Sequence, residues 1–337
     1  MRVSFSFADG ARYSVDCGPE ETVLAAARRA DVPLLFQCES GACATCSARL
    51  VAGNADMLEG SGASLLPSEA AEGLRLTCRC IPRGDCEFAL AYDSVAGTRE
   101  PERYESNIDD IEWVAANVVR LRLALPDDDW FDFVPGQFVQ VRVPGTEHWR
   151  SYSMASGPGD MPTLELLIRV LDHGVMSDYL RDEAEAGDLV ELEGPYGSFQ
   201  LQKSKAPHIF VAGGTGLAPF LSMLDRIRTY SGTKPELVLI FGCADGRDVF
   251  CVDTLEDAAY MLPKLRTRIT ADTHADPAAG VLAGNPVAHL EPADVVAPGT
   301  TAYLCGPPAM VDAARQRLLE LGLPSTQIIA EQFVATD

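Results

Sequence analysis

The sequence predicts a multidomain protein in which an α+β segment, a run of short antiparallel strands and an α/β segment follow one another. Its 337 residues exceed what a single hydrophobic core usually serves. Its ten cysteines are unevenly spread, since seven of them precede residue 90. Short alternating strands give way near residue 206 to apolar runs that alternate with helices. We therefore expect domains at residues 1–93, 111–203 and 204–337, with a linker at 94–110.

The composition argues against several classes of protein. The formal net charge is −22, from 49 acidic and 27 basic residues, and such a chain repels nucleic-acid phosphates and anionic lipid headgroups. The sequence has no apolar run of about 18 residues, and its first residues lack the apolar core of an export signal. We expect a soluble, cytoplasmic protein that binds neither nucleic acid nor membrane. The acidic excess serves solubility or forms a docking face for a protein partner.

Residues 1–93 predict a strand pair, one short helix and further strands. The helix ETVLAAARRA has Val23, Leu24 and Ala27 on one side and two arginines in its last turn, where cations suit the helix dipole. The stretch DSVAGTREPERYESNIDDIE that follows is polar and charged, which is typical of a linker.

The remaining two segments differ in strand pattern. In 111–203 the runs VVRLRLAL, FVQVRV, LELLIRVL and LVELEG are separated by Pro and Gly, which favours a small antiparallel barrel or sandwich. A helix, VMSDYLRDEA, interrupts them. From 204 onward HIFVAGG, ELVLIFG and TAYLCGP are typical of buried parallel strands that end in glycine. The helices GLAPFLSMLDRIRTY and AMVDAARQRLLELG alternate with them.

Four cysteines stand at a spacing that carries chemistry. Cys38, Cys43, Cys46 and a later Cys78 give C-x4-C-x2-C…C, the plant-type [2Fe–2S] ligand spacing. The small residues between them keep the backbone close to the sulfurs and leave N–H groups free to bond them. A structural zinc site or ordinary buried thiols are the alternatives, but zinc prefers paired C-x2-C knuckles. Cys80 competes with Cys78 for the fourth position, and Cys78 is preferred because it directly follows an apolar strand.

Residues 1–93 thus resemble a plant-type ferredoxin domain, and the order that follows resembles the ferredoxin–NAD(P)⁺ reductase superfamily. The most similar group is the three-domain reductase of multicomponent aromatic-ring-hydroxylating dioxygenases of the benzoate and anthranilate type. The resemblance covers essentially the whole chain and rests on several motifs in the same order. It implies a β-grasp [2Fe–2S] ferredoxin domain, an antiparallel β-barrel FAD domain and a parallel-sheet α/β NAD domain.

Two motifs in 111–203 resemble flavin contacts. In Arg150-Ser151-Tyr152-Ser153 an arginine can pair with a pyrophosphate oxygen, a tyrosine can lie on the isoalloxazine ring and a serine can bond its edge. The resemblance implies these roles for Arg150, Tyr152 and Ser153, the last of them near N5. A turn into a helix at Gly174 offers free N–H groups to an anion. By resemblance, the further FAD contacts are Ile168, Arg169, Val170, Gly174, Val175, Met176 and Ser177.

Two further motifs resemble a nicotinamide site. VAGGTGLAP joins a buried strand to a helix, the context of a phosphate-binding turn, and its last position is Pro219, which disfavours the G-x-G-x-x-G fold. By resemblance, Gly214, Thr215 and Gly216 approach the coenzyme. The resemblance also places Cys305 beside the nicotinamide C4 and the flavin N5, with Gly306 and Pro307 as neighbouring contacts. An alternative is a buried strand-end cysteine. In the first interpretation Cys305 orients the nicotinamide, and such orientation supplies much of the hydride-transfer rate.

Coenzyme choice depends on the segment after the second strand. Asp245 could accept from a ribose 2′-hydroxyl and would repel a 2′-phosphate, whereas Arg247 favours the phosphate. We prefer NADH, chiefly because the family uses it. Phe333 resembles the family's C-terminal aromatic residue, which shields the flavin until coenzyme displaces it.

These motifs predict an NADH:acceptor oxidoreductase that passes electrons from NADH through FAD and the cluster to a terminal Rieske oxygenase. Cys305 and Ser153 are the candidate catalytic residues, and the resemblance implies a monomer. The alternatives are the reductase of a di-iron phenol- or methane-type monooxygenase and a non-catalytic zinc-binding scaffold.

Overall fold

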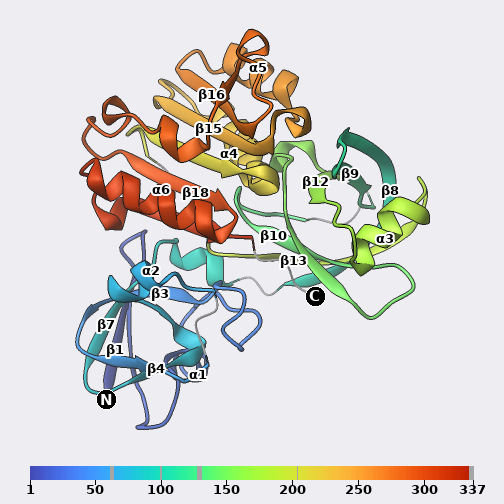
Figure 1. Cartoon of the computed structure of the whole chain (residues 1–337). Helices are drawn as coiled ribbons and strands as arrows, with labels where there is room; N and C mark the ends of the chain where they lie inside the picture. The colour runs from blue at the N-terminus through green and yellow to red at the C-terminus, as the bar shows by residue number, and fades with distance from the viewer. Residues whose placement is uncertain (61–63, 99–100, 127–130, 203, 334–337) are drawn as a thin grey trace. The chain divides into compact units, whose positions relative to one another are not determined.

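The computed structural model describes residues 1–60, 64–98, 101–126, 131–202 and 204–333 of the chain (Figure 1). These residues form two compact units. The first comprises Met1–Pro101 and Tyr196–Gln202, and the second comprises Glu102–Pro195 and Lys203–Asp337. Among the described residues, none of the helices combines the length and apolar character needed to span a bilayer.

The first unit is built on a five-stranded sheet in the order β2-β1-β7-β3-β5. The strands of this sheet are β1 (Arg2–Ser6), β2 (Arg12–Asp16), β3 (Ser47–Ala52), β5 (Leu74–Leu76) and β7 (Cys86–Ala89). Two short strands, β4 (Ala55–Met57) and β6 (Cys80–Pro82), pair separately. Strands β1 and β7 are parallel and β1 and β2 are antiparallel, so the sheet is mixed, as the predicted β-grasp fold requires.

Helix α1 (Val23–Arg29) lies where the sequence predicts a helix. Thr22 caps it by accepting from the N–H of Ala25 at 3.2 Å, which satisfies one of the free donors of the first turn. Its residues Val23 and Leu24 are buried with Phe5 and Phe88 in the core of this unit. The second helix of the unit is α2 (Pro67–Ala71).

The second unit begins with a six-stranded antiparallel sheet in the order β11-β10-β13-β8-β9-β12. Its strands are β8 (Glu102–Ala115), β9 (Val118–Ala124), β10 (Phe138–Arg142), β11 (Trp149–Ser153), β12 (Thr163–Arg169) and β13 (Leu189–Tyr196). A bridge between Met154 and Leu166 joins the chain after β11 to β12. Because these are the two ends of the strand order, the sheet closes into a barrel. Helix α3 (Val175–Asp182) follows β12.

The linker is shorter than predicted, because β8 starts at Glu102. Buried and exposed residues alternate along this part of β8: Ser106 and Ile108 are buried, while Glu105 and Asn107 are exposed. Charge on the solvent face of a strand gave the segment the composition of a linker. Ser94–Thr98, at the start of the predicted linker, forms a 3₁₀ turn.

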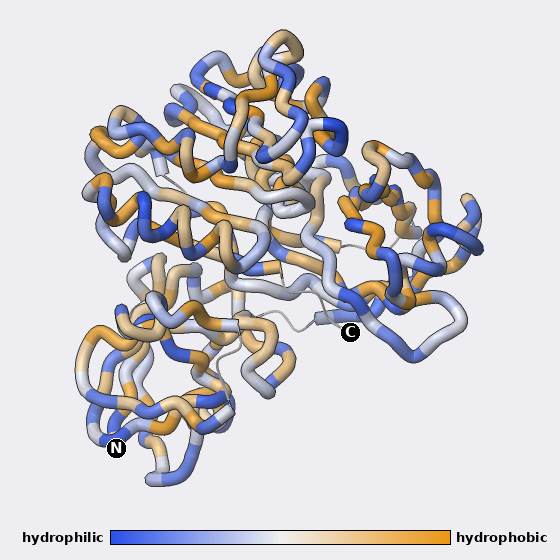
Figure 2. The backbone as a smooth tube through the Cα atoms, in the orientation of Figure 1, coloured by the Kyte–Doolittle hydropathy of each residue, from blue (hydrophilic) through white to orange (hydrophobic). Residues whose placement is uncertain are grey.

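The rest of the second unit is a parallel six-stranded sheet in the order β17-β16-β15-β14-β18-β19 (Figure 1). Its strands are β14 (His208–Gly213), β15 (Leu237–Asp245), β16 (Leu265–Thr273), β17 (Val281–Ala283), β18 (Thr301–Gly306) and β19 (Ile328–Gln332). The helices are α4 (Ala218–Arg228), α5 (Val252–Met261) and α6 (Pro308–Glu320). The central strands follow hydrophobic stretches of the chain, and hydrophobic and hydrophilic positions alternate along α6 (Figure 2).

The fold class is confirmed, and helices α4 and α6 and three central strands of this sheet occur where the sequence predicts them, whereas helix α5 was not predicted. The outer strands were not predicted. Strand β16 has the sequence LRTRITADT, in which only Leu265, Thr270 and Ala271 are buried. Its pattern resembles a surface segment because one strand edge meets only the short β17.

The amino edge of the parallel sheet carries an open depression of about 250 Å³. Lys205, Lys234 and Lys264 line it, just before β14, β15 and β16. The sequence contains only four lysines, and the fourth, Lys203, lies outside the described residues. The amino ends of parallel strands lie at the opposite sheet edge from their carboxyl ends.

Candidate cofactor sites

The cysteine loop of the first unit is a series of tight turns. Glu39, Gly41 and Ala44 all have positive φ, at 51°, 87° and 56°, so the backbone curls around the sulfurs. The N–H of Ala42 donates to Cys38 Sγ at 3.3 Å. Such bonds to sulfur are the type that the small residues of the motif predict.

The four motif thiols are arranged as two pairs. A hydrogen bond from Cys43 lowers the pKa of Cys38 to about 3 and the reverse contact raises the pKa of Cys43. A hydrogen bond between Cys46 and Cys78 lowers the pKa of the first thiol and raises that of the second. Across the described residues, no three metal-binding side chains gather as they would around a single ion. Two pairs of thiols instead fit a two-iron cluster, in which each iron takes two cysteine sulfurs.

Cys80 lies elsewhere in the same unit. It is fully buried, which raises the pKa of its thiol to about 12, and the charged groups near it are Arg75 and Asp56. The structure therefore brings Cys78 and not Cys80 next to Cys46. Thr77 anchors this arrangement, because its N–H and hydroxyl both donate to the carbonyl of Cys46, at 3.1 and 3.0 Å.

The predicted flavin motif forms strand β11 of the barrel. Tyr152 packs against the barrel core, where burial raises the pKa of its phenol, so the ring is neutral and planar contact is its main chemistry. The guanidinium of Arg150 is partly exposed and donates to the carbonyl of Trp149 at 3.1 Å. Ser151 is exposed and Ser153 is buried. The motif thus offers a cation and a ring on one strand.

The second flavin motif is the turn from β12 into α3. Gly174 has φ +148° and precedes the first turn of the helix, so the free N–H groups of Val175 and Met176 lie at a helix start. Buried Ser177 accepts from the N–H of Leu171 at 3.0 Å, which holds the turn. A helix start with free N–H groups and a hydroxyl suits a phosphate.

The glycine-rich turn after β14 lies against the end of β18. A Cβ on Gly216 would be 2.3 Å from the carbonyl oxygen of Cys305, so only glycine allows this approach. At Gly214, φ is +56° and a Cβ would meet no described atom within 4 Å. Open space beside a turn that requires glycine suits a bound phosphate or ribose. Thr215 lies between these two glycines in a 3₁₀ turn.

Three polar side chains meet at the carboxyl end of the parallel sheet. Ser153 donates to Glu331 Oε2 at 3.4 Å, and Glu331 lies opposite Cys305 in the β18–β19 register. Burial raises the pKa of Glu331 to about 8, and burial and then Glu331 raise the pKa of Cys305. The structure thus brings the two predicted catalytic residues to one carboxyl group.

Glu331 is the residue that sequence reasoning missed as a site residue. The segment around it predicted only a role for Phe333, whose N–H donates to the carbonyl of Gly306 at 2.9 Å. Pairing of β19 with β18 is what aligns Glu331 with Cys305. The signal in the sequence was a carboxylate two residues before that aromatic residue.

Asp245 caps the 3₁₀ turn after β15, and its carboxylate contacts Arg247 and His274. Arg247 donates to it through Nε at 3.0 Å and Nη2 at 2.6 Å, which lowers the pKa of the carboxyl. His274 Nδ1 lies 3.0 Å from Oδ2 of the same residue. The two residues that argued for different coenzymes therefore form one ion pair.

Comparison with known proteins identifies the domains in which these motifs lie. Three family models match in order: the 2Fe-2S iron-sulfur cluster binding domain over 6–83, the oxidoreductase FAD-binding domain over 105–201 and the oxidoreductase NAD-binding domain over 210–316. The electron transfer component of toluate 1,2-dioxygenase from Pseudomonas putida is 32% identical over 99% of both chains.

The chain belongs to the family of oxygenase electron transfer components. A second member, the electron transfer component of 2-halobenzoate 1,2-dioxygenase from Burkholderia cepacia, is 31% identical over 99% of this chain and 98% of that one. Methane monooxygenase component C from Methylosinus trichosporium is 38% identical over 70% of this chain and 71% of its own. Among solved structures, an Amycolatopsis cytochrome P450 reductase is similar, with a TM-score of 0.73, 29% identity and 99% coverage of both chains.

This electron transfer component is an oxidoreductase whose cofactors are FAD, NADH and a [2Fe–2S] cluster. The predicted cofactors and enzyme class are confirmed. The match to the iron-sulfur family favours a [2Fe–2S] cluster over the alternative of a zinc-binding scaffold.

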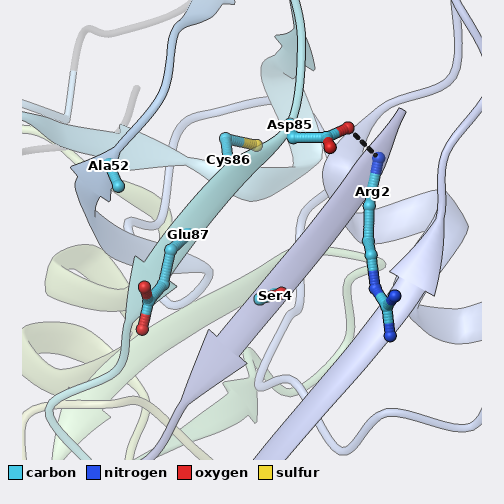
Figure 3. Close-up of a pocket in the computed structure, with 6 residues that line it drawn as sticks. All are labelled: Arg2, Ser4, Ala52, Asp85, Cys86 and Glu87. Atoms are coloured by element: carbon cyan, nitrogen blue, oxygen red, sulfur yellow. Dashed lines mark hydrogen bonds between the residues drawn. The ribbon is translucent and has the colours of Figure 1, made fainter.

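The ferredoxin domain of the electron transfer component also has a shallow depression of about 270 Å³ (Figure 3). The described residues that line it are Arg2, Ser4, Ala52, Asp85, Cys86 and Glu87. None of them is one of the four motif cysteines. Asp85 accepts from the N–H of Arg2 at 2.7 Å, and burial raises the pKa of Cys86 to about 11. Arg2, Ser4 and Glu87 alternate with the buried residues of β1 and β7, so the depression lies on the solvent face of the sheet.

Proposed function

We propose that this chain delivers electrons from NADH to the Rieske-type terminal oxygenase of an aromatic-ring dioxygenase whose substrate is an aromatic carboxylate. The observation that carries the proposal is the full-length similarity to the toluate component, at 32% identity over 99% of both chains. When bound, FAD would take the two electrons of NADH as one hydride and would release them singly to the cluster.

The residues of this chain would hold the cofactors as follows. Cys38 and Cys43 would bind one iron and Cys46 and Cys78 the other, as the two thiol pairs support. Arg150 would neutralise the FAD pyrophosphate together with the N–H groups at the start of α3. Tyr152 would contact the flavin ring.

At the carboxyl end of the parallel sheet, the turn from Gly214 to Gly216 would receive the coenzyme. Cys305, with Gly306 and Pro307, would orient the nicotinamide, since orientation supplies much of the rate. Ser153 and Glu331 would hold a proton within their hydrogen bond, because the raised pKa of Glu331, about 8, keeps its carboxyl protonated at lower pH. Asp245 would accept from the ribose 2′-hydroxyl.

A second candidate acceptor is the hydroxylase of a di-iron monooxygenase. It is favoured by the 38% identity to methane monooxygenase component C, over 70% of this chain. The two candidates share every step up to the cluster, so they differ only in the protein that takes the electrons.

Reconstitution tests the proposal. The purified chain, with NADH, is combined with the terminal oxygenase of a benzoate-type dioxygenase, with a di-iron hydroxylase, or with a bacterial cytochrome P450. Product formed per NADH consumed is then measured. We expect coupled dihydroxylation with the first. Coupling only with one of the others would transfer the assignment to that acceptor, and an anaerobically reduced chain without an electron paramagnetic resonance signal would remove the cluster. Sedimentation velocity tests the expected monomer.

A further inference from the structure

The turn between β8 and β9 of the barrel lies against the segment that follows β15. We call residues 116–120 the barrel turn and residues 245–254 the coenzyme loop, which contains Asp245 and the first residues of α5. Both belong to the second unit. The barrel turn is a two-residue hairpin, since Ala115 pairs with Val118.

Asn117 of the barrel turn bonds in two directions. Its side-chain Nδ2 donates to Asp248 Oδ2 of the coenzyme loop at 3.4 Å. Its carbonyl accepts from the N–H of Val170 at 2.8 Å, and Val170 directly follows β12, the strand that is predicted to run along the flavin. A single residue therefore connects the coenzyme loop to the flavin strand.

Arg120 makes the second connection. Its Nη2 donates to Cys251 Sγ at 3.1 Å and to Thr254 Oγ1 at 3.5 Å. Its Nη1 donates to Glu112 of the barrel at 2.9 Å, and the side chain is only 15% exposed. Glu112 of the barrel thus holds one terminal nitrogen of the guanidinium, while the other donates to residues at the start of α5.

The backbone at this start is strained. Cys251 precedes the first residue of α5 and has φ +57°, a left-handed conformation that non-glycine residues adopt only where the surroundings determine it. Cys251 is 9% exposed, and burial raises the pKa of its thiol, so the sulfur is a neutral acceptor for Arg120. The strain and the contact coincide at one residue.

We propose that Asn117 and Arg120 are positioning residues for hydride transfer: they hold the coenzyme loop against the flavin barrel, so that NADH bound at Asp245 reaches the flavin in one orientation. This inference rests on the proposed function. Neither residue needs to touch the coenzyme, because each acts through Asp248, Cys251 or Thr254. A small displacement of the loop would turn the nicotinamide away from the flavin.

The test uses the complete chain with FAD and the cluster. Asn117→Ala, Asn117→Asp and Arg120→Lys are compared with wild type by anaerobic stopped-flow reduction with NADH, which separates the dissociation constant from the rate of flavin reduction. We expect the dissociation constant to rise roughly 5- to 30-fold and the rate to fall as well. Asn117→Asp should be worse than Asn117→Ala, because it puts a second carboxylate beside Asp248. FAD content and reduction by dithionite should not change.

Arg122→Ala is the matched control. Arg122 lies on the same strand and its hydrogen bonds go to Glu165 and Asp110 of the barrel, so its loss should leave NADH binding within about twofold of wild type. Wild-type kinetics in both Asn117→Ala and Arg120→Lys would overturn the inference, as would an equal loss in Arg122→Ala. If Arg120→Lys does not fold, Thr254→Ala and the two Asn117 variants provide the test of the inference. A wild-type chain that is not reduced by NADH would instead refute the proposed function.

Discussion

At the scale of single residues, the Cys78 and Cys80 thiols show how two neighbours in the sequence take different environments. The 3₁₀ turn Thr77–Arg79 places Cys78 beside Cys46, whereas Cys80 begins β6 and is fully buried. The C-x4-C-x2-C spacing could be predicted from the sequence because it is local. The choice of the fourth cysteine rests on a turn that brings residues 32 positions apart together, which spacing alone does not determine.

Replacing each of these two thiols tests the assignment. Cys78→Ser should abolish or badly impair the cluster, because one iron loses a ligand, while NADH-dependent ferricyanide reduction through FAD continues. Cys80→Ser should retain the cluster and lower the free energy of unfolding by about 1–3 kcal/mol, because it buries a hydroxyl in an apolar site. Visible and electron paramagnetic resonance spectra make the measurement. A normal cluster in Cys78→Ser together with its loss in Cys80→Ser would reverse the assignment.

Glu331 gives a pH dependence whose sign follows from its environment. Its pKa is raised by burial to about 8, from an ordinary value of 4.5. Between these values the folded state binds more protons than the unfolded state, so this group makes stability fall as pH rises from about 4.5 to about 8. In FAD-free protein, Glu331→Gln should flatten the slope of unfolding free energy against pH over that range.

Urea titrations at several pH values measure this slope. Glu320→Gln is the control, since Glu320 is 67% exposed on α6 and pairs with Arg317. An unchanged slope in Glu331→Gln would show that the carboxyl is not buried in its neutral form.

The ion pair of Asp245 and Arg247 makes a prediction about coenzyme choice. Removing the carboxylate should relax the preference for NADH twice over, because it removes the repulsion of a 2′-phosphate and also releases the Arg247 guanidinium to bind that phosphate. Asp245→Ala should therefore raise kcat/KM for NADPH, and Asp245→Ala with Arg247→Ala should raise it less. Steady-state ferricyanide assays with both coenzymes decide. Equal NADH to NADPH ratios in wild type and both variants would remove Asp245 from the site.

At the scale of elements, the central strands could be predicted because burial on both faces leaves a continuous apolar run, and helices α4 and α6 could be predicted from their apolar faces. Strand β14 has all six residues buried. Strand β8 was missed because its exposed face is charged, and β19 because its burial depends on β18, a partner about 25 residues away in the sequence. That pairing also placed Glu331 at the site. Elements with one exposed face are defined by their partners more than by their own sequence.

The glycine turn after β14 gives an element-scale prediction. Gly216→Ala puts a methyl group 2.3 Å from the backbone carbonyl oxygen of Cys305, and backbone cannot yield as a flexible side chain does. The free energy of unfolding should fall by about 1–3 kcal/mol and NADH binding should weaken. Gly159→Ala is the control, because a Cβ there would meet no described atom within 4 Å. Urea titration and NADH titration measure both effects, and equal stabilities would show that the turn and β18 lie further apart.

At the scale of the whole molecule, three matched domains and full-length relatives agree with the order of motifs along the chain. The order was predictable because each cofactor motif is local. The identity of the electron acceptor was not, since acceptor proteins are recognised by surfaces whose residues come from separate elements. A dioxygenase electron transfer component and a methane monooxygenase component both match this chain. Reconstitution is therefore needed to decide between the two kinds of acceptor.

The distribution of lysine has a practical consequence. Three of the four lysines line the depression at the amino edge of the parallel sheet, while Cys305 and the glycine turn lie at its carboxyl edge. Amine-coupling chemistry, applied to a carboxylated graphite electrode, would therefore tether the α/β domain by the edge that does not bind coenzyme. Molecules attached through Lys205, Lys234 or Lys264 would keep the carboxyl edge of the sheet open to dissolved NADH and could pass its electrons to the electrode.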